Sequence, residues 1–180
     1  NFSQYSSRYD RYIVHDVAPA FDPSLSGGVL YDLNVYNLSL IAALFGRPQS
    51  AVYTANIGFN GIDTSGVMTL RYNGFVATAA AAKDSSSPSF FMIQGESGWI
   101  RADGPPNELT SFTVGLRGRE EKTYALNRHA HRMVHEFEAM RDIFARKDYM
   151  SVEEGLQISR MVIALMEKAR LVAGIQFRVD

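Results

Sequence analysis

The sequence predicts an α+β fold built on a largely antiparallel, open sheet. Residues 49–126 contain short runs rich in Val, Ile, Thr, Phe and Tyr, separated by turn residues. Amphipathic helical patterns precede and follow this block. Because the strands form one block between helices, we expect the helices to pack on one face of the sheet.

Before the first helix, the chain combines aromatic and polar residues with turn formers, and we expect a short strand followed by a long loop within residues 1–26. Ser26, Gly27 and Gly28 then lead into a helix that ends before Gly46 and Pro48. Its apolar residues recur at the spacing of one helical face. They are Leu30, Leu33, Leu40, Ile41 and Leu44.

Turn residues divide the central block into strands. Asn73 and Gly74 lie between Tyr72 and Phe75, which predicts a two-residue hairpin turn with positive φ at both central positions. The small side chains of residues 79–82 indicate a strand closely covered by another element, most simply a helix.

Two further amphipathic helices follow. Ser151 and Glu154 have the spacing of a capping box, which predicts the start of the second helix. Gly174 ends it, and residues 175–179 can add a last strand. The apolar positions are Met133, Phe137, Met140 and Phe144 in the first helix and Val152, Leu156, Ile163, Met166 and Ala169 in the second.

A sheet of five to seven strands with only three helices has one uncovered face. Aromatic and aliphatic residues occupy alternate positions of the strands, so this face is expected to be apolar. Large exposed apolar patches mark interfaces. We therefore expect a homo-oligomer, a dimer or tetramer, that forms through the open face of the sheet.

Composition excludes several classes of function. With 18 basic and 19 acidic residues, the net charge is −1, so neither nucleic acid nor an anionic membrane surface is an expected partner. We identify no apolar run of the ~20 residues that a membrane span requires. The lack of cysteine excludes disulfides and thiolate chemistry and fits a cytoplasmic protein. Residues 1–180 are expected to form a single domain.

Asp32 and Tyr36 form the most suggestive pair for chemistry, because residues four apart share one face of a helix. A carboxylate can orient or polarise a phenol whose proton passes to or from a substrate oxygen. The alternative is structural: a carboxylate that favours the helix start and a half-buried tyrosine.

His131 and His135 also lie four residues apart, a spacing that allows two imidazoles to bind one metal ion. A metalloprotease motif requires glutamate where the chain has Arg132, and no third ligand is identifiable. We therefore interpret these histidines, and His129, as surface residues and expect no metal.

The N-terminal loop offers Arg8, Tyr9 and Tyr12 as substrate-binding residues, since arginine provides a rigid fork of donors and tyrosine a face for sugar rings. A structural role for the three is equally open. The chain contains no G-x-G-x-x-G fingerprint, P-loop or G-x-S-x-G elbow, so it has no nucleotide cradle of its own.

Several segments together resemble the C-terminal half of the Gfo/Idh/MocA oxidoreductases, the family of glucose-fructose oxidoreductase and inositol dehydrogenase. The resemblance covers nearly all of the chain, and it depends on the order and spacing of the segments. They are Ser26-Gly27-Gly28-Val29-Leu30-Tyr31-Asp32-Leu33-Asn34-Val35-Tyr36-Asn37, Leu44-Phe45-Gly46-Arg47-Pro48, Gly61-Ile62-Asp63, Gly95-Glu96-Ser97-Gly98-Trp99-Ile100, Glu136-Phe137 and Gly174-Ile175.

The resemblance implies a two-domain enzyme whose N-terminal Rossmann domain, absent from this chain, mainly binds NAD or NADP. A lysine of that domain would work with Asp32 and Tyr36, which take the family's Asp and His or Tyr positions. The implied reaction moves a hydride to or from a sugar, polyol or similar small hydroxy or carbonyl compound. On this basis the 180-residue chain alone is expected to be inactive.

Two positions depart from the family pattern. Asn34 stands where glycine is common, and Tyr36 stands where many members have histidine, so the proton relay would be phenolic, as in the dihydrodiol dehydrogenase branch. The alternative function is a non-catalytic α+β module for oligomerisation or ligand sensing, in which Asp32 and Tyr36 are structural.

Overall fold

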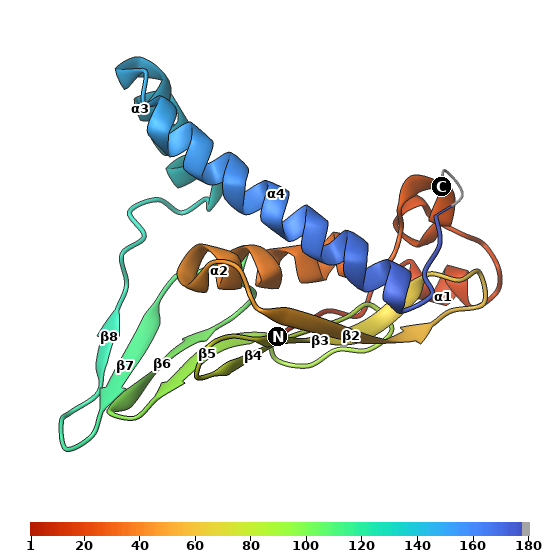
Figure 1. Cartoon of the computed structure of the whole chain (residues 1–180), viewed down its shortest axis with the longest axis horizontal. Helices are drawn as coiled ribbons and strands as arrows, with labels where there is room; N and C mark the ends of the chain where they lie inside the picture. The colour runs from red at the N-terminus through yellow and green to blue at the C-terminus, as the bar shows by residue number, and fades with distance from the viewer. Residues whose placement is uncertain (178–180) are drawn as a thin grey trace.

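The computed structural model describes residues 1–177, which form eight strands among their helices (Figure 1). The strands are β1 (Phe2–Ser3), β2 (Ser50–Ile57), β3 (Asp63–Arg71), β4 (Val76–Ala82), β5 (Phe90–Gly95), β6 (Gly98–Asp103), β7 (Phe112–Leu116) and β8 (Lys122–Tyr124). The helices are α1 (Tyr9–Tyr12), α2 (Val35–Phe45), α3 (Met133–Arg146) and α4 (Tyr149–Val172), with 3-10 turns η1 (Pro19–Phe21) and η2 (Pro23–Leu25) and a π-helix, η3 (Leu30–Asn34).

The strands form two four-stranded sheets instead of the single sheet of five to seven strands that the sequence suggested. Sheet A has the order β1-β4-β3-β2 and sheet B the order β5-β6-β7-β8. All pairs are antiparallel except β1 with β4. Asn1 links the sheets, because its carbonyl accepts a hydrogen bond from the Phe90 amide at 3.1 Å. The α+β class and the antiparallel open sheets are therefore confirmed.

Short turns join β3 to β4 and β5 to β6, and the first lies where the sequence placed it. β3 and β4 are joined through Asn73 and Gly74, and Arg71 pairs with Val76. Only Gly74 has a positive φ, 87°, so the prediction of positive φ at both residues was wrong. The second turn, Glu96-Ser97, connects β5 to β6, where Gly95 pairs with Gly98.

Helices η3 and α2 cover the alanine-rich strand β4, as predicted for residues 79–82. The cover is close because two asparagine side chains reach the strand. Asn34 Nδ2 donates to the Ala79 carbonyl at 3.2 Å, and Asn37 Nδ2 donates to the Ala80 carbonyl at 3.0 Å. Small residues on β4 are required, since longer side chains would separate the helix from these carbonyls.

The core lies between sheet A and the helices on its inner face. Figure 1 shows α2 and α4 on the same side of β2 to β4. Each fully buried leucine or methionine there contributes about 1.5–3 kcal/mol. The buried residues of this cluster include Leu30, Leu38, Ile41, Met68, Leu70, Ala79, Val162, Met166 and Ile175. Leu44, predicted on the same apolar face, is half exposed.

The last two helices form an arm in which α3 packs on the far end of α4, away from sheet A (Figure 1). Both helices were predicted, but the start of α4 was not. Asp148 caps it by accepting from the Ser151 amide, three residues before the predicted cap. None of the residues of α3 is buried, and Phe137, Met140 and Phe144 are exposed.

The chain after α4 differs from the predicted last strand. Gly174 ends the helix with φ 78°, as expected. Residues 175–177 form no strand, although Ile175 and Phe177 are buried, and the rest of the predicted strand lies outside the described residues.

The stretch Pro23–Phe45 is long and apolar enough, by length and composition, to cross a membrane, contrary to the sequence expectation. In the structure it consists of η2, η3 and α2, and Leu30, Leu38 and Ile41 contribute to the core. Part of this stretch therefore packs in the core of the domain.

Candidate functional site

The helix that carries Asp32 and Tyr36 begins as the π-helix η3 and continues as α2. Short π-helical segments occur frequently at functional sites. Asp32 lies in the middle of η3, and Tyr36 is the second residue of α2. Tyr31 fixes the segment to α4, because its hydroxyl donates to Glu167 Oε2 at 2.9 Å. Burial, followed by Glu167, raises the pKa of Tyr31 to about 12, so this phenol keeps its proton.

The start of this helix is held by Asp63, the aspartate of the Gly61-Ile62-Asp63 segment. Asp63 Oδ2 accepts from the Leu30 amide at 2.8 Å and from the Tyr53 hydroxyl at 2.5 Å. Gly28, with φ 129°, leaves the space that Asp63 Oδ1 occupies, and a Cβ there would collide with it. The glycine before the helix therefore makes room for an internal carboxyl group.

Burial raises the pKa of Asp63, and the hydrogen bonds from Tyr53 and Leu30 act in the opposite direction. Burial also raises the pKa of Tyr53, with the adjacent Asp63 as the next cause. A free helix N-terminus attracts anions such as phosphate. Here the protein's own carboxyl group fills that position.

Lys83, which the sequence analysis did not single out, holds Asp32. Its side chain is 3% exposed, and its Nζ lies 2.7 Å from Asp32 Oδ2. The same ammonium donates to the Ala20 carbonyl at 2.8 Å and lies 4.4 Å from the centre of the Phe21 ring. A buried ammonium requires such partners. The only sequence signal for it was a lysine directly after the buried alanine run of β4.

Asp32 and Tyr36 both face the surface. The Asp32 side chain is 49% exposed and Tyr36 is 43% exposed. The two side chains share no hydrogen bond in the described part of the chain, and Tyr36 contacts Phe2 with ring centres 5.9 Å apart. The expected direct contact between acid and phenol is replaced by the Asp32–Lys83 ion pair.

The predicted substrate-binding residues lie on and beside α1. Arg8 is exposed and Tyr9 is half-buried. Tyr12 is buried, and its hydroxyl donates to Asn60 Oδ1 at 2.6 Å. Tyr12 stacks on Phe21 with ring centres 4.9 Å apart. From this position Tyr12 shapes the loop from inside and presents no surface to a ligand.

A chain of contacts connects this loop to Asp32. Tyr9 and Tyr12 both contact Phe21, Phe21 lies under the ammonium of Lys83, and Lys83 pairs with Asp32. The structure thus brings Tyr9, Tyr12 and Asp32 into one connected region, although 20 residues separate Tyr12 from Asp32 in the sequence.

Four grooves of the described chain lie elsewhere. One groove of about 380 Å³ lies between β2 and α4 and includes Tyr53 and Lys168, and another of about 410 Å³ lies on the outer face of sheet A. Asp32 and Tyr36 line none of the four. The candidate site therefore presents an anchored carboxylate and a phenol that are both about half exposed at the surface.

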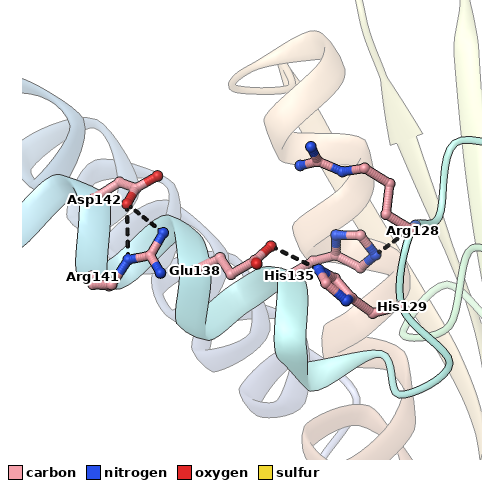
Figure 2. A network of polar contacts seen from close by, with 6 residues as sticks. All are labelled: Arg128, His129, His135, Glu138, Arg141 and Asp142. Atoms are coloured by element: carbon pink, nitrogen blue, oxygen red, sulfur yellow. Dashed lines mark hydrogen bonds and ion pairs between the residues drawn. The ribbon is translucent and has the colours of Figure 1, made fainter.

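The histidines are arranged differently from the predicted His131–His135 pair. His131 Nδ1 accepts from the Met133 amide at 3.3 Å, at the start of α3. His129, His135 and Glu138 instead come together, and one ligand atom from each lies within 4.8 Å of the others. Figure 2 shows these three side chains pointing toward one another.

Two curated relatives match the whole chain. An uncharacterised oxidoreductase of Escherichia coli, YgjR, is 31% identical over 180 residues, which are 54% of its length. The scyllo-inositol 2-dehydrogenase (NADP⁺) IolU of Bacillus subtilis is also 31% identical over 180 residues, 55% of its length. The chain thus spans about half the length of the curated relatives it matches.

Solved structures share the fold. UDP-N-acetylglucosamine 3-dehydrogenase GnnA from Acidithiobacillus ferrooxidans superimposes with a TM-score of 0.65 at 17% identity, over 96% of this chain and 50% of that one. The 3-ketoreductase KijD10 from Actinomadura kijaniata, in complex with NADP, superimposes with a TM-score of 0.59 at 12% identity. The match covers 98% of this chain and 46% of that one.

A family model settles the classification. The model of the GFO/IDH/MocA C-terminal domain matches residues 2–101, the part of the chain that contains β1 to β5, most of β6, Asp32, Tyr36, Asp63 and Lys83. The resemblance seen in the sequence is confirmed: this chain belongs to the Gfo/Idh/MocA oxidoreductase family, with the fold of its C-terminal domain.

Proposed function

We propose that the chain is the substrate-binding and subunit-contact domain of an NAD(P)-dependent oxidoreductase that acts on a CH–OH or carbonyl group of a sugar, polyol or similar small molecule. The family and the scyllo-inositol dehydrogenase among its relatives support this class of reaction. The observation that carries the proposal is the open surface on which the buried Lys83 anchors Asp32, one helical turn before Tyr36.

The helix start after Gly27 and Gly28 does not fit the phosphates of a dinucleotide. The helix start that follows Gly27 and Gly28 already holds the Asp63 carboxyl group, and a Cβ at either glycine would meet neighbouring atoms. We therefore assign the cofactor mainly to a domain outside residues 1–180. When bound, that cofactor supplies or accepts the hydride.

The chain's own residues act on the substrate oxygen. The ammonium of Lys83 fixes one oxygen of Asp32, so the other oxygen can accept a hydrogen bond from a substrate hydroxyl. Tyr36 can donate its phenolic proton to the oxygen that gains charge as the carbonyl is reduced, and can take it back in the reverse direction. Lys83 is a positioning residue in this scheme, because it acts through Asp32.

Arg8 is exposed on the N-terminal loop, the half-buried Tyr9 follows it, and Tyr12 stacks on Tyr9 from the buried side. A guanidinium and an aromatic face suit a polyol with several hydroxyl groups. Phe21 contacts both Tyr9 and Lys83, and Lys83 pairs with Asp32. These contacts hold the loop in position relative to Asp32.

We further propose that the outer face of sheet A contacts a second subunit in a homodimer or homotetramer. The inner face is covered by α2 and α4, whereas Val52, Val67 and Val76 are exposed on the strands of the sheet. The alternating pattern of sequence hydrophobicity and the shallow groove on this face support a packed interface. The cytoplasmic location and the single domain over residues 1–180 remain predictions of the sequence.

Replacing Tyr36 with phenylalanine tests the catalytic proposal. In the complete protein, assayed with scyllo-inositol and NADP⁺ first and then with a panel of sugars and polyols, we expect Tyr36→Phe to lower kcat/KM about 100-fold. Tyr149→Phe, at a residue 75% exposed at the start of α4, is the matched control and should keep wild-type turnover. Activity of Tyr36→Phe within a few fold of wild type favours the non-catalytic module instead.

Replacing Lys83 with methionine keeps most of the buried stem but removes the ammonium. The Ala20 carbonyl then loses its donor, so the free energy of unfolding in urea should fall by about 1–3 kcal/mol. Lys168→Met, at an exposed lysine of α4, should change it by less than about 0.5 kcal/mol. Equal stability of the two variants would show that the Lys83 contacts are unimportant.

Replacing Val67 with arginine tests the interface, because Val67 lies on a central strand of sheet A and is 44% exposed. In sedimentation velocity, the complete protein should shift toward the monomer. Val14→Arg, at a loop residue that is 70% exposed, should leave the oligomer intact. An unchanged oligomer in Val67→Arg would place the subunit contact elsewhere.

A further inference from the structure

We propose that His129, His135 and Glu138 form a binding site for one divalent transition-metal ion of the Zn²⁺ type, independent of the oxidoreductase site. The sequence offered two histidines on this helix without a third ligand. In the structure, His129 and not His131 lies beside His135, and Glu138 is the third candidate ligand (Figure 2).

The three side chains come from two adjoining segments. His135 and Glu138 are three residues apart on α3, so they share one face of the helix. His129 comes from the segment between β8 and α3 and turns back toward them. Its Nε2 lies 3.0 Å from Glu138 Oε2, and its ring centre lies 4.9 Å from that of His135.

These separations suit a metal ion. Zinc binds nitrogen and carboxylate oxygen at about 2.0–2.2 Å, so two ligands of a tetrahedral ion lie roughly 3.4 Å apart. The His129–Glu138 pair is already near this value, and the 4.8 Å limit for the group leaves only a small side-chain movement. Two imidazoles and one carboxylate form a known zinc ligand set that leaves the fourth position to water.

The surroundings leave the ligands accessible. His129 and Glu138 side chains are 34% and 35% exposed, which allows an ion and its water to enter. Arg141 is engaged by Asp142 at 2.8 Å. The Arg128 amide donates to His135 Nε2 at 3.3 Å, a long hydrogen bond that the ion replaces.

The site would give the arm a cross-link that its packing does not supply. None of the residues of α3 is buried, and α3 makes few contacts beyond α4. An ion shared by His129 and α3 would fix the segment after β8 to the helix, as structural metal sites do in small domains.

Calorimetric titration with ZnCl₂, in a buffer without chelators and with any affinity tag removed, tests the proposal on the complete protein. We expect saturable binding of one ion per chain. His135→Ala and Glu138→Gln should each weaken it about tenfold or more, since each removes one of three ligands. His131→Ala is the matched control, because this histidine lies two residues from His129 but outside the group, and it should bind as wild type does.

Cobalt gives an independent readout. The visible d–d absorption of four-coordinate Co²⁺ should appear with the wild type and with His131→Ala, and should be lost with Glu138→Gln. Circular dichroism spectra matching the wild type would exclude unfolding of the variants, which change partly exposed side chains. Non-saturable binding, or equal weakening by His131→Ala and His135→Ala, would identify diffuse binding to surface histidines and overturn the proposal.

Discussion

Asp63 holds the start of the helix on which the candidate site is built. Its carboxyl group accepts the Leu30 amide and the Tyr53 hydroxyl, and it occupies the space that Gly28 leaves free. Because this contact joins β3 to η3, it sets where Asp32 and Tyr36 emerge relative to sheet A. It also fills the helix N-terminus, the position that a dinucleotide phosphate would need.

The ion pair between Lys83 and Asp32 is the second contact that positions the candidate site. Lys83, directly after β4, carries a buried charge that Asp32, the Ala20 carbonyl and the Phe21 ring stabilise together. The ammonium thereby connects the N-terminal loop with the helix and leaves Asp32 half exposed. We propose that this surface holds a substrate oxygen and that another domain completes the site.

Much of the fold could be predicted because it follows from local patterns. The Asn73-Gly74 turn, the helix after Gly28 and the covered alanine strand depend on neighbouring residues. The bond between Asn1 and Phe90 that links the two sheets joins residues far apart, and no local pattern reports it. The cap of α4 was misplaced because Asp148 accepts from the Ser151 amide, the bond that Glu154 would accept in the predicted capping box.

The candidate site was predictable in its residues but not in its contacts. Helical spacing and the family resemblance selected Asp32 and Tyr36, yet spacing alone paired them with each other. The actual partner of Asp32 is 51 residues away, and a lysine after an alanine run reads as an exposed strand end. Likewise, Tyr12 looked like a surface aromatic, whereas its stack on Phe21 and its bond to Asn60 depend on the folded loop.

We propose that this chain provides the substrate side of the reaction and that another domain holds the dinucleotide. Calorimetric titration of NADPH and NADH into the complete protein and into the 180-residue chain tests it directly. We expect the complete protein to bind a dinucleotide and the 180-residue chain alone to bind neither. Binding of either dinucleotide by the chain alone with the affinity of the complete protein would contradict it.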